Sequence, residues 1–315
     1  RLVREEYKKA GITPDQVDTG AVIITGETSR KENARAVLEG LSTLAGDFVV
    51  ATAGPNLESV LAAKGAGAVE LSRQTGKTVL HIDIGGGTSN LALIKEGNIV
   101  ATGCMNVGGR LLKFDRGKIS YASPVLQGLT DLQPGDYPAP GQVEGIAKIL
   151  VSGLEMAAGL RQPTELLEKL WTRECEDCHN QSADWFRNDN AGCMISFSGG
   201  VADCIETDHR PGAFGDMGVE LGQAIRQSLL CRGQYVLGSQ TIRATVIGAG
   251  CHSAQLSGST VFCRGVSLPV KNLPVAVFSR QEQQSDSLDR LIAGRLSRFD
   301  SEAVVLALPG NAGGY

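Results

Sequence analysis

The stretch Val79-Leu-His-Ile-Asp-Ile-Gly-Gly-Gly-Thr-Ser-Asn-Leu-Ala-Leu93 decides the fold. It starts with a short apolar run rich in β-forming residues, continues with three glycines and ends with a second apolar segment. This pattern predicts a buried strand, a tight turn and a second strand. Because glycine adopts backbone conformations that a Cβ forbids, the turn at Gly85–Gly87 can aim several N–H groups at one anion, as phosphate-binding nests do.

Polar side chains flank the three glycines. Asp83 stands where the first strand ends, and Thr88, Ser89 and Asn90 follow the turn. Mg²⁺ prefers oxygen ligands and keeps part of its hydration shell, so a carboxylate beside a phosphate cradle suggests a Mg²⁺ ion bound by Asp83 through water. The alternative interpretation is a β-hairpin with a glycine-rich bulge, since glycine turns are common.

A second segment that runs from a strand into glycines, Met194-Ile-Ser-Phe-Ser-Gly-Gly-Val201, repeats this design. Gly199 and Gly200 would let a flat ligand lie against bare backbone, although an ordinary strand-to-helix turn gives the same pattern. Further along, Thr245-Val-Ile-Gly-Ala-Gly250 is a strand or the start of a helix, and its small residues permit close packing.

The composition indicates a globular α/β protein. The chain has 315 residues, which is enough for two domains or one two-lobed fold, and 42% of them are hydrophobic. Its 40 glycines are nearly twice the usual share of about 7%. The net charge of −4 comes from mixed charges without a basic stripe, which argues against nucleic acid as the main partner. No apolar run of about 18 residues and no signal-peptide pattern is present, so we expect no membrane span.

Eight scattered cysteines read as cytosolic thiols rather than a disulfide framework. Cys175-Glu-Asp-Cys-His179 has the spacing of a c-type haem attachment site and of half a zinc site. Haem attachment would require export, and zinc would require two further ligands. We therefore expect an incidental polar loop here, with a metal site as the alternative.

Periodicity predicts a chain in which strands and helices alternate, which favours a parallel or mixed sheet with helices on its faces. The expected elements are a helix ending near Gly11, a strand at 21–24, a capped helix from Ser29 to about 44, a strand at 48–50, a helix at 57–65, the hairpin at 79–93 followed by a strand at 99–100, a loop or insertion at 115–141, helices at 143–160 and 164–171, a strand at 194–198, a helix at 218–230, strand segments at 260–262 and 268–277, a polar linker at 279–289, a helix at 291–299 and a strand at 303–308.

Asp83-Ile-Gly-Gly-Gly-Thr88 resembles the second phosphate motif of the actin, heat-shock-70 and sugar-kinase superfamily. In the same order, Ile195-Ser-Phe-Ser-Gly-Gly-Val201 resembles its adenosine loop and Val246-Ile-Gly-Ala-Gly250 its second connecting helix, while Gly54 to Gly67 resembles the first connecting segment more loosely. The resemblance implies an α/β, two-lobed actin-like ATPase fold, with ribonuclease-H-like mixed sheets, flanking helices and an incomplete N-terminal lobe, closed over ATP.

The resemblance also implies roles for individual residues. ATP and Mg²⁺ would be the cofactors, with Asp83 on Mg²⁺-bound water and Thr88 orienting phosphate or the attacking water as the catalytic pair. The residues implied to bind the nucleotide are Gly85, Gly86, Gly87, Thr88, Ser89 and Asn90 on the γ-phosphate side, and Gly199, Gly200 and Val201 at the base and ribose. Heat-shock-70 proteins carry a second acid where Asn90 stands. Glu27 and Glu58 are candidates for orienting water, the alternative for Glu58 being a solvated helix residue.

A closer resemblance is to the ethanolamine utilisation family that reactivates ethanolamine ammonia-lyase. It covers residues 1 to about 278, with a weaker tail and a divergent region at about 115–193. The segments that carry it are Ala10-Gly-Ile-Thr-Pro14, Thr25-Gly-Glu27, Gly46-Asp-Phe-Val-Val50, Ala53-Gly-Pro55, Leu57-Glu-Ser-Val60, Gly65-Ala-Gly67, Asn106-Val-Gly-Gly-Arg-Leu-Leu112, Arg243-Ala-Thr-Val-Ile-Gly-Ala-Gly250 and Asn272-Leu-Pro-Val275.

This family resemblance implies an ATP-dependent, chaperone-like exchange of damaged for intact adenosylcobalamin on the lyase. The lyase would be the partner, with a possible homo-oligomer, no nucleic acid and no membrane, in a bacterial cytoplasm or beside a microcompartment. The superfamily's first phosphate loop is not in this chain and the family continues beyond Tyr315, so we expect a middle portion of a longer protein. The expected domains are 1–77 as the remainder of the first lobe, 78–253 as the second lobe with an insertion at about 115–193, and 254–315 as a C-terminal segment.

Two other functions stay open at this level. A small-molecule kinase of the same superfamily would present a catalytic Asp in a substrate cleft. A non-catalytic, actin-like scaffold would polymerise and have no effect on recovery of the lyase.

Overall fold

The computed structural model describes residues 2–13, 16, 20–24, 48–52, 55–172, 193–253, 274–285, 287–296 and 304–308. The chain divides into two compact units, Arg1–Ser257 and Gly258–Tyr315. The predicted helix at 29–44, Glu27, the Cys175–His179 segment and the predicted strand at 260–262 lie outside the described residues.

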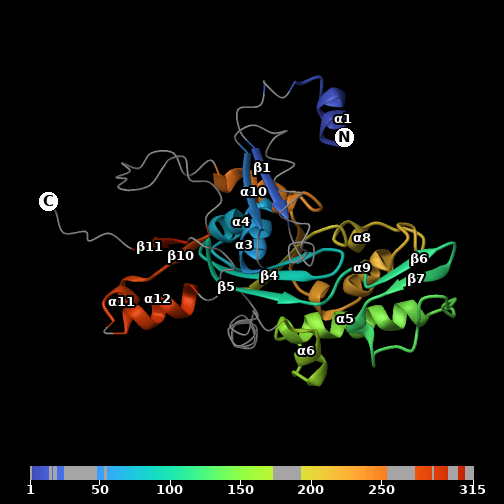
Figure 1. Ribbon diagram of the computed structural model, residues 1–315. Coiled ribbons are helices and arrows are strands. Elements are labelled where there is room, and N and C mark those ends of the chain that lie inside the picture. The colour runs from blue at the N-terminus through green and yellow to red at the C-terminus, as the bar shows by residue number, and fades with distance from the viewer. Residues whose placement is uncertain are drawn as a thin grey trace. The chain divides into compact units, whose positions relative to one another are not determined.

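A mixed five-stranded sheet forms the centre of the first unit (Figure 1). Its strand order is β5 (Asn98–Met105), β4 (Ser89–Lys95), β3 (Thr78–Ile84), β8 (Cys193–Ser198) and β9 (Tyr235–Leu237). The pairs β3–β4 and β4–β5 are antiparallel, whereas β3–β8 and β8–β9 are parallel. The predicted hairpin is confirmed, and the sheet has the ribonuclease-H-like arrangement that the resemblance implied.

Nearly every residue of β3 and β4 is buried, and consecutive residues of a strand point to opposite sides, so the sheet is covered on both faces there. Leu80, Ile82 and Ile84 join the large core, which also contains residues of α5 (Gln142–Ala157) and α9 (Gly218–Arg226). The other face packs on α3 (Pro55–Gly65) and α4 (Ala68–Thr75) through a smaller cluster of buried side chains: Ala63, Ala68, Val79, Ala92, Ile94 and Met194. His81 and Asp83 belong to this second face by the same alternation.

Helix α10 (Ala244–Ser253) packs on α3 without side chains between the two backbones. A Cβ on Gly65 would lie 1.8 Å from the carbonyl oxygen of Ala244, and a Cβ on Gly248 would lie 1.9 Å from that of Leu61. The choice between strand and helix at 245–250 is thus settled in favour of a helix. Helix α10 also contacts β1 (Gly20–Ile24), which pairs in parallel with β2 (Phe48–Thr52).

Several of the remaining elements of the first unit were not predicted from the sequence. Helix α4 was not predicted, and a hairpin of β6 (Leu112–Asp115) and β7 (Lys118–Ala122) extends into the range 115–141 that was expected to be a loop or insertion. Its turn has positive φ at Arg116 and Gly117, the conformation of tight hairpin turns. The other elements are α1 (Leu2–Ala10), the 3-10 helix η3 (Pro124–Leu126), α6 (Glu165–Leu170), α8 (Asp203–Glu206) and the 3-10 helix η4 (Leu229–Cys231).

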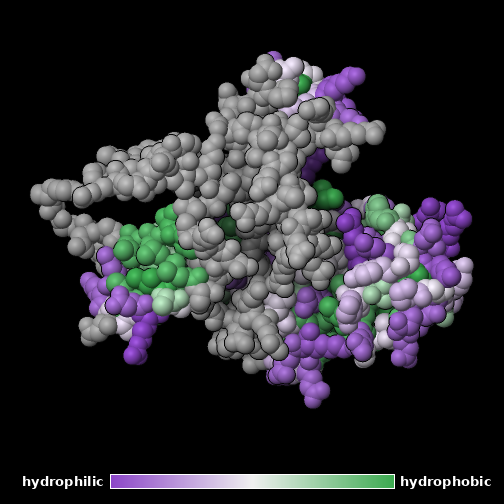
Figure 2. Space-filling view, in the orientation of Figure 1, coloured by the Kyte–Doolittle hydropathy of each residue, from purple (hydrophilic) through white to green (hydrophobic). Residues whose placement is uncertain are grey.

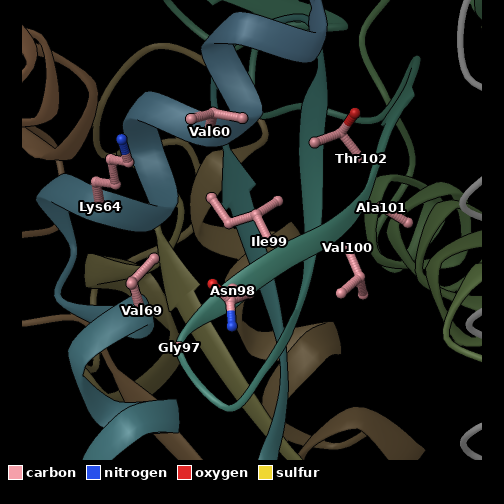
Figure 3. Close-up of a pocket in the computed structure, with 9 residues that line it drawn as sticks. All are labelled: Val60, Lys64, Val69, Gly97, Asn98, Ile99, Val100, Ala101 and Thr102. Carbon is pink, nitrogen blue, oxygen red and sulfur yellow. The ribbon is translucent and has the colours of Figure 1, made fainter. Parts of the chain in front are cut away.

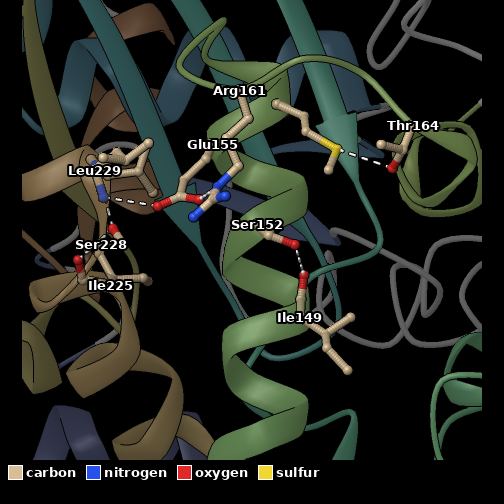
Figure 4. A network of polar contacts seen from close by, with 10 residues as sticks. Ile149, Ser152, Glu155, Arg161, Thr164, Ile225, Ser228 and Leu229 are labelled. Atoms are coloured by element: carbon tan, nitrogen blue, oxygen red, sulfur yellow. Dashed lines mark hydrogen bonds and ion pairs between the residues drawn. The ribbon is translucent and has the colours of Figure 1, made fainter.

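A buried carboxylate connects the end of α5 to the turn after α9 (Figure 4). Glu155 is 3% exposed, pairs with the Arg161 guanidinium and accepts a 2.8 Å hydrogen bond from the backbone N–H of Leu229. The Ser228 hydroxyl accepts from the N–H of Leu230 and so caps the start of η4. The predicted helix at 218–230 therefore ends at Arg226, because Ser228 caps a new turn instead of continuing the old one.

The second unit contains a two-stranded parallel sheet and two helices. Strand β10 (Val275–Val277) pairs with β11 (Val305–Ala307), and the helices are α11 (Arg280–Gln283) and α12 (Leu288–Leu296). The linker predicted at 279–289 is wrong in part, because Ser279 and Glu282 form a reciprocal capping box that starts α11. Figure 2 shows hydrophobic side chains gathered over β10 and β11, where Val275 and Val277 are exposed.

In the part of the chain that the structure describes, we find no helix with the length and apolar character needed to span a membrane.

We predict that Gly248→Ala lowers the free energy of unfolding by about 1–3 kcal/mol, because its Cβ would force α10 away from α3. Gly250→Ala on the same helix is the matched control, since a Cβ there meets no atom within 4 Å. We expect the control to be neutral or to stabilise by up to about 1 kcal/mol through helix propensity. Urea unfolding followed by circular dichroism measures both, and equal effects of the two substitutions would contradict the proposed contact.

Candidate functional site

The two predicted glycine turns lie at the same end of the sheet. They follow β3 and β8, which are neighbouring parallel strands, so their carboxyl ends meet at one edge. The N–H of Val201 donates to the carbonyl oxygen of Ile84 over 3.2 Å. Gly199 has φ +87°, and a Cβ on it would lie 2.2 Å from the same oxygen. The turn after β8 therefore crosses directly over the end of β3, which requires glycine at position 199.

A third glycine segment holds the first turn from its outer side. The N–H of Gly109 donates to Gly85 O over 3.0 Å, and that of Arg110 donates to Gly86 O over 2.6 Å. A Cβ on Gly108 would lie 2.4 Å from Gly86 O, so backbone meets backbone here as well. The family-like segment at 106–112 stands out in the sequence, but its place beside the first turn does not.

This third segment is held in turn by the glycine turn after β8 and by the start of α9. The N–H of Met217 donates to Gly109 O over 3.0 Å. A Cβ on Gly109 would lie 3.0 Å from Cγ2 of Val201 and 3.0 Å from Cα of Gly218. The backbone segments after β3, β5 and β8 therefore form one continuous, close-packed platform.

Two polar side chains, Asp83 and Asn90, face each other across β3 and β4 beside the first turn. They are register partners in this antiparallel pair, so their side chains lie on one face of the sheet. Asp83 is 7% exposed and Asn90 is 2% exposed. The side-chain oxygen of Asn90 has no hydrogen-bond partner among the described residues. A buried oxygen without a donor beside a carboxylate fits a hydrated cation, which supplies O–H donors and prefers oxygen ligands.

A buried hydrogen-bond chain extends from Asp83 into the sheet. Ser198 Oγ donates to Asp83 and lies 2.9 Å from Nε2 of His81, whose Nδ1 lies 3.1 Å from Oγ of Ser196. Burial raises the pKa of the Asp83 carboxyl, and the hydrogen bond from Ser198 partly offsets that rise. Burial lowers the pKa of His81 to about 3, so the imidazole is neutral at physiological pH.

Sequence reasoning missed this chain of side chains. The signal was present as polar residues two positions apart on two apolar strands, namely His81 with Asp83 and Ser196 with Ser198. Spacing alone does not reveal that the two strands pair in parallel and in register, which is what brings the four side chains together.

The other predicted site residues differ in what they expose. Thr88 is half-buried at the turn, with its side chain partly accessible. The Ser89 hydroxyl is buried and donates to Val107 O over 2.8 Å, so its proton holds the third glycine segment. The side chain of Val201 is 4% exposed and packs in the large core, and the nucleotide contact that the resemblance implied for this residue stays a prediction.

Two charged residues outside the turns differ in exposure. Glu58 on α3 is 9% exposed, so the alternative of a solvated helix residue is wrong. Arg110, which the sequence analysis did not single out, has its side chain against Gly86 and is 68% exposed. Its Nε lies 3.5 Å from Oδ2 of Asp216, so a positive charge remains accessible at the outer side of the first turn.

A pocket of about 480 Å³ lies elsewhere, along the edge strand β5 (Figure 3). Val60 and Lys64 of α3 and Val69 of α4 form one wall, and residues 97–102 form the other. Gly97 belongs to the turn between β4 and β5, which is at the end of the sheet opposite Asp83. The pocket therefore does not coincide with the glycine turns.

Two of the cysteines that the structure describes, Cys204 and Cys231, are free thiols. Burial raises the pKa of Cys204 to about 11 and that of Cys231 to about 12, so both are protonated and weak as nucleophiles or metal ligands. Within the described ranges, no three His, Cys, Asp or Glu side chains gather in a way that could hold a metal ion.

The mixed sheet, the glycine turns after two adjacent parallel strands and the two helices packed through glycines agree with the actin-like fold that the resemblance implied. The model of the family described as ethanolamine utilisation protein EutA matches residues 1–312. The chain belongs to this family.

Two curated relatives carry the name ethanolamine ammonia-lyase reactivase EutA. The one from Salmonella typhimurium is 40% identical over 98% of this chain, and the one from Escherichia coli is 39% identical over 98%. The chain spans 65% of the length of each. Among solved structures, the Aquifex aeolicus member of the Ppx/GppA family is similar with a TM-score of 0.43 and 11% identity, over 81% of this chain and 80% of that one.

We predict that Asp83→Asn raises the melting temperature of the nucleotide-free protein at pH 7.5. The pKa of Asp83 is raised in the folded state above its ordinary value of 3.8, so ionisation costs stability progressively as the pH rises above that value. Asparagine removes this cost and keeps an acceptor for Ser198. The difference between variant and parent should therefore shrink as the pH falls toward 4.

Thermal unfolding across this pH range measures the effect, with Asp131→Asn as an exposed-carboxylate control. A difference that grows toward low pH would contradict the assignment of Asp83 as a buried carboxylate with a raised pKa.

Proposed function

We propose that this chain is the nucleotide-binding part of a reactivase that exchanges damaged for intact adenosylcobalamin on ethanolamine ammonia-lyase at the expense of ATP. Family membership and the names of the curated relatives support the lyase as partner. The observation that carries the proposal is the placement of two glycine turns beside Asp83 and Asn90 at one end of one sheet. This end offers N–H groups, a carboxylate and flat backbone within one platform.

The first turn is the proposed phosphate cradle. The N–H of Gly85 closes the turn by donating to Thr88 O over 2.9 Å. The structure records no hydrogen bond from the N–H groups of Gly86, Gly87 and Thr88 to any residue that it describes. Such a row of backbone donors around a glycine turn suits phosphate oxygens. The accessible guanidinium of Arg110 adds positive charge on the outer side of this cradle.

Asp83 and Asn90 are the proposed holders of Mg²⁺, Asp83 through a bound water. A Mg²⁺ ion held by these two residues would supply positive charge to neutralise the phosphates. The orphaned oxygen of Asn90 and the carboxylate of Asp83 would accept hydrogen bonds from its water ligands. Thr88, half-buried at the turn, would orient a phosphate oxygen or the attacking water, and Glu58 remains a candidate for orienting water from α3.

The second turn is the proposed adenosine side of the site. Gly199 is fixed against Ile84, while Gly200 is exposed and has bare backbone to which a flat base can be apposed. The glycine contact between α3 and α10 is the proposed hinge, because helices packed without intervening side chains have few rotamers to rearrange when they shift. Its movement would couple nucleotide state to the lyase's cobalamin site.

We predict that Asp83→Ala weakens Mg²⁺-dependent ATP binding by at least about 10-fold, a typical loss when a group that orients metal ligands is removed. The same variant should fail to restore cyanocobalamin-blocked ethanolamine ammonia-lyase, whereas the parent protein restores activity when ATP, Mg²⁺ and fresh adenosylcobalamin are all supplied. Isothermal titration calorimetry measures binding, and the lyase assay measures recovery.

Asp131→Ala, at an exposed position, is the control for loss of a carboxylate. Equal ATP affinity and equal recovery with Asp83→Ala and with the parent would refute the nucleotide site. Nucleotide binding with phosphorylation of an added alcohol, and no recovery of the lyase, would support a kinase instead. Nucleotide-dependent polymers without recovery would support a scaffold.

A further inference from the structure

We infer that Ser198 is a positioning residue for Asp83. The Ser198 hydroxyl is itself oriented by His81, which is in turn hydrogen-bonded to Ser196. The inference rests on the proposed nucleotide site and deepens it, because it names the device that aims the metal-holding carboxylate. Ser198 does not itself touch the nucleotide in this proposal. It acts through Asp83.

The four side chains form one row on one face of the sheet. His81 pairs in register with Ser196, and Asp83 pairs in register with Ser198, across the parallel strands β3 and β8. His81 and Ser198 are 0% exposed, Ser196 is 1% exposed and Asp83 is 7% exposed. The row therefore begins deep under α3 and α4 and ends at the turn where the phosphate cradle starts.

The hydrogen bonds in this row allow one direction for the protons when Asp83 is ionised. A carboxylate only accepts, so the single proton of the Ser198 hydroxyl points to Asp83. The Ser198 oxygen then accepts from Nε2–H of His81 at 2.9 Å. A neutral imidazole carries one N–H, so Nδ1 must accept, and the Ser196 hydroxyl donates to it at 3.1 Å.

This direction has a consequence for the metal. Oδ1 of Asp83 is already engaged by Ser198, so Oδ2 is the oxygen left for a metal-bound water. The rotamer of the carboxylate is fixed from behind, as carboxylates that hold metal ions commonly are. The Asn90 oxygen, which has no partner among the described residues and is the register neighbour of Asp83 on β4, would be a second acceptor for metal-bound water.

The residues next to the polar row on the same face of the sheet indicate that the row has a specific role. Toward the other end of the same face the strands present Val79 and Met194, which are apolar and buried. Buried polar groups cost free energy unless they are all bonded, and hydrophobic residues would fill such positions without that requirement. The polar row occupies the part of the face that leads to Asp83, where an aimed carboxylate is needed.

The test is the Mg²⁺ dependence of nucleotide binding in the whole chain. A fluorescent ATP analogue is titrated at fixed concentration with Mg²⁺, and again in EDTA. We expect Ser198→Ala to raise the Mg²⁺ concentration for half-maximal binding by about 10–100-fold, the usual range for groups that orient metal ligands. Binding in EDTA should change less than about 2-fold, because the backbone cradle is intact. Ser198→Thr restores the hydroxyl and should return the Mg²⁺ dependence to near the parent value.

Two further variants keep the test decisive. Ser198→Cys fills the same space with a weak donor and should show the same loss of Mg²⁺ affinity even if the alanine variant does not fold. Ser72→Ala is the matched control, because Ser72 is equally buried on α4 and donates to Lys77 O, away from Asp83. It should leave the Mg²⁺ dependence unchanged.

A Ser198→Ala or Ser198→Cys variant with the parent's Mg²⁺ dependence would overturn the inference while leaving the nucleotide site standing. Equal losses in Mg²⁺ and in EDTA would also overturn it, because they indicate a general structural role. Absence of any nucleotide binding by the parent chain would contradict the proposed function and this inference with it.

Discussion

The parallel pairing of β3 with β8 is the constraint on which the rest of the site depends. It places the residues after both strands at one edge, so two glycine turns that are more than a hundred residues apart in sequence become neighbours. It also sets Asp83 beside Ser198 and His81 beside Ser196. A shift of this pairing by one residue would move every side chain of one strand to the opposite face and separate the polar row.

Close backbone contacts between glycines and neighbouring chain segments recur throughout the first unit. Gly108 meets Gly86, Gly199 meets Ile84, and Gly248 meets Leu61, each at a distance that leaves no space for a Cβ. Two of these contacts build the platform, and the third joins α3 to α10. Part of the high glycine content of the chain is thereby explained, because the site and the proposed hinge use the same device of bare backbone packed on bare backbone.

The features that could be predicted from the sequence are those that depend on local patterns of apolar residues and glycines. The hairpin at residues 79–93, the strand before Gly199 and the helices that end near residues 10 and 65 follow from apolar periodicity and glycine position. The β6–β7 hairpin was missed because four prolines at 124–140 made the whole range 115–141 read as a loop. Helix α11 was missed because a capping box, not periodicity, starts it.

The candidate site was predictable in its backbone and less so in its side chains. The glycines and Asp83 stand out in the sequence, and the structure brings them together. Burial of Ser89 and Val201 was not predictable, since it depends on the segment after β5 packing against both turns. The His81–Ser198 contact depends on strand register, which no local pattern specifies.

The most direct test of the central claim is the response of backbone amides to nucleotide. The glycines of the protein are labelled with nitrogen-15. The chemical shifts of their amides are recorded by NMR before and after addition of Mg²⁺ and a non-hydrolysable ATP analogue. Our account predicts that the largest changes fall on Gly86, Gly87 and Gly200, while Gly97 at the opposite end of the sheet is unaffected. If saturating nucleotide changed the amide chemical shift of Gly97 and left those of the two glycine turns unchanged, the account would be contradicted.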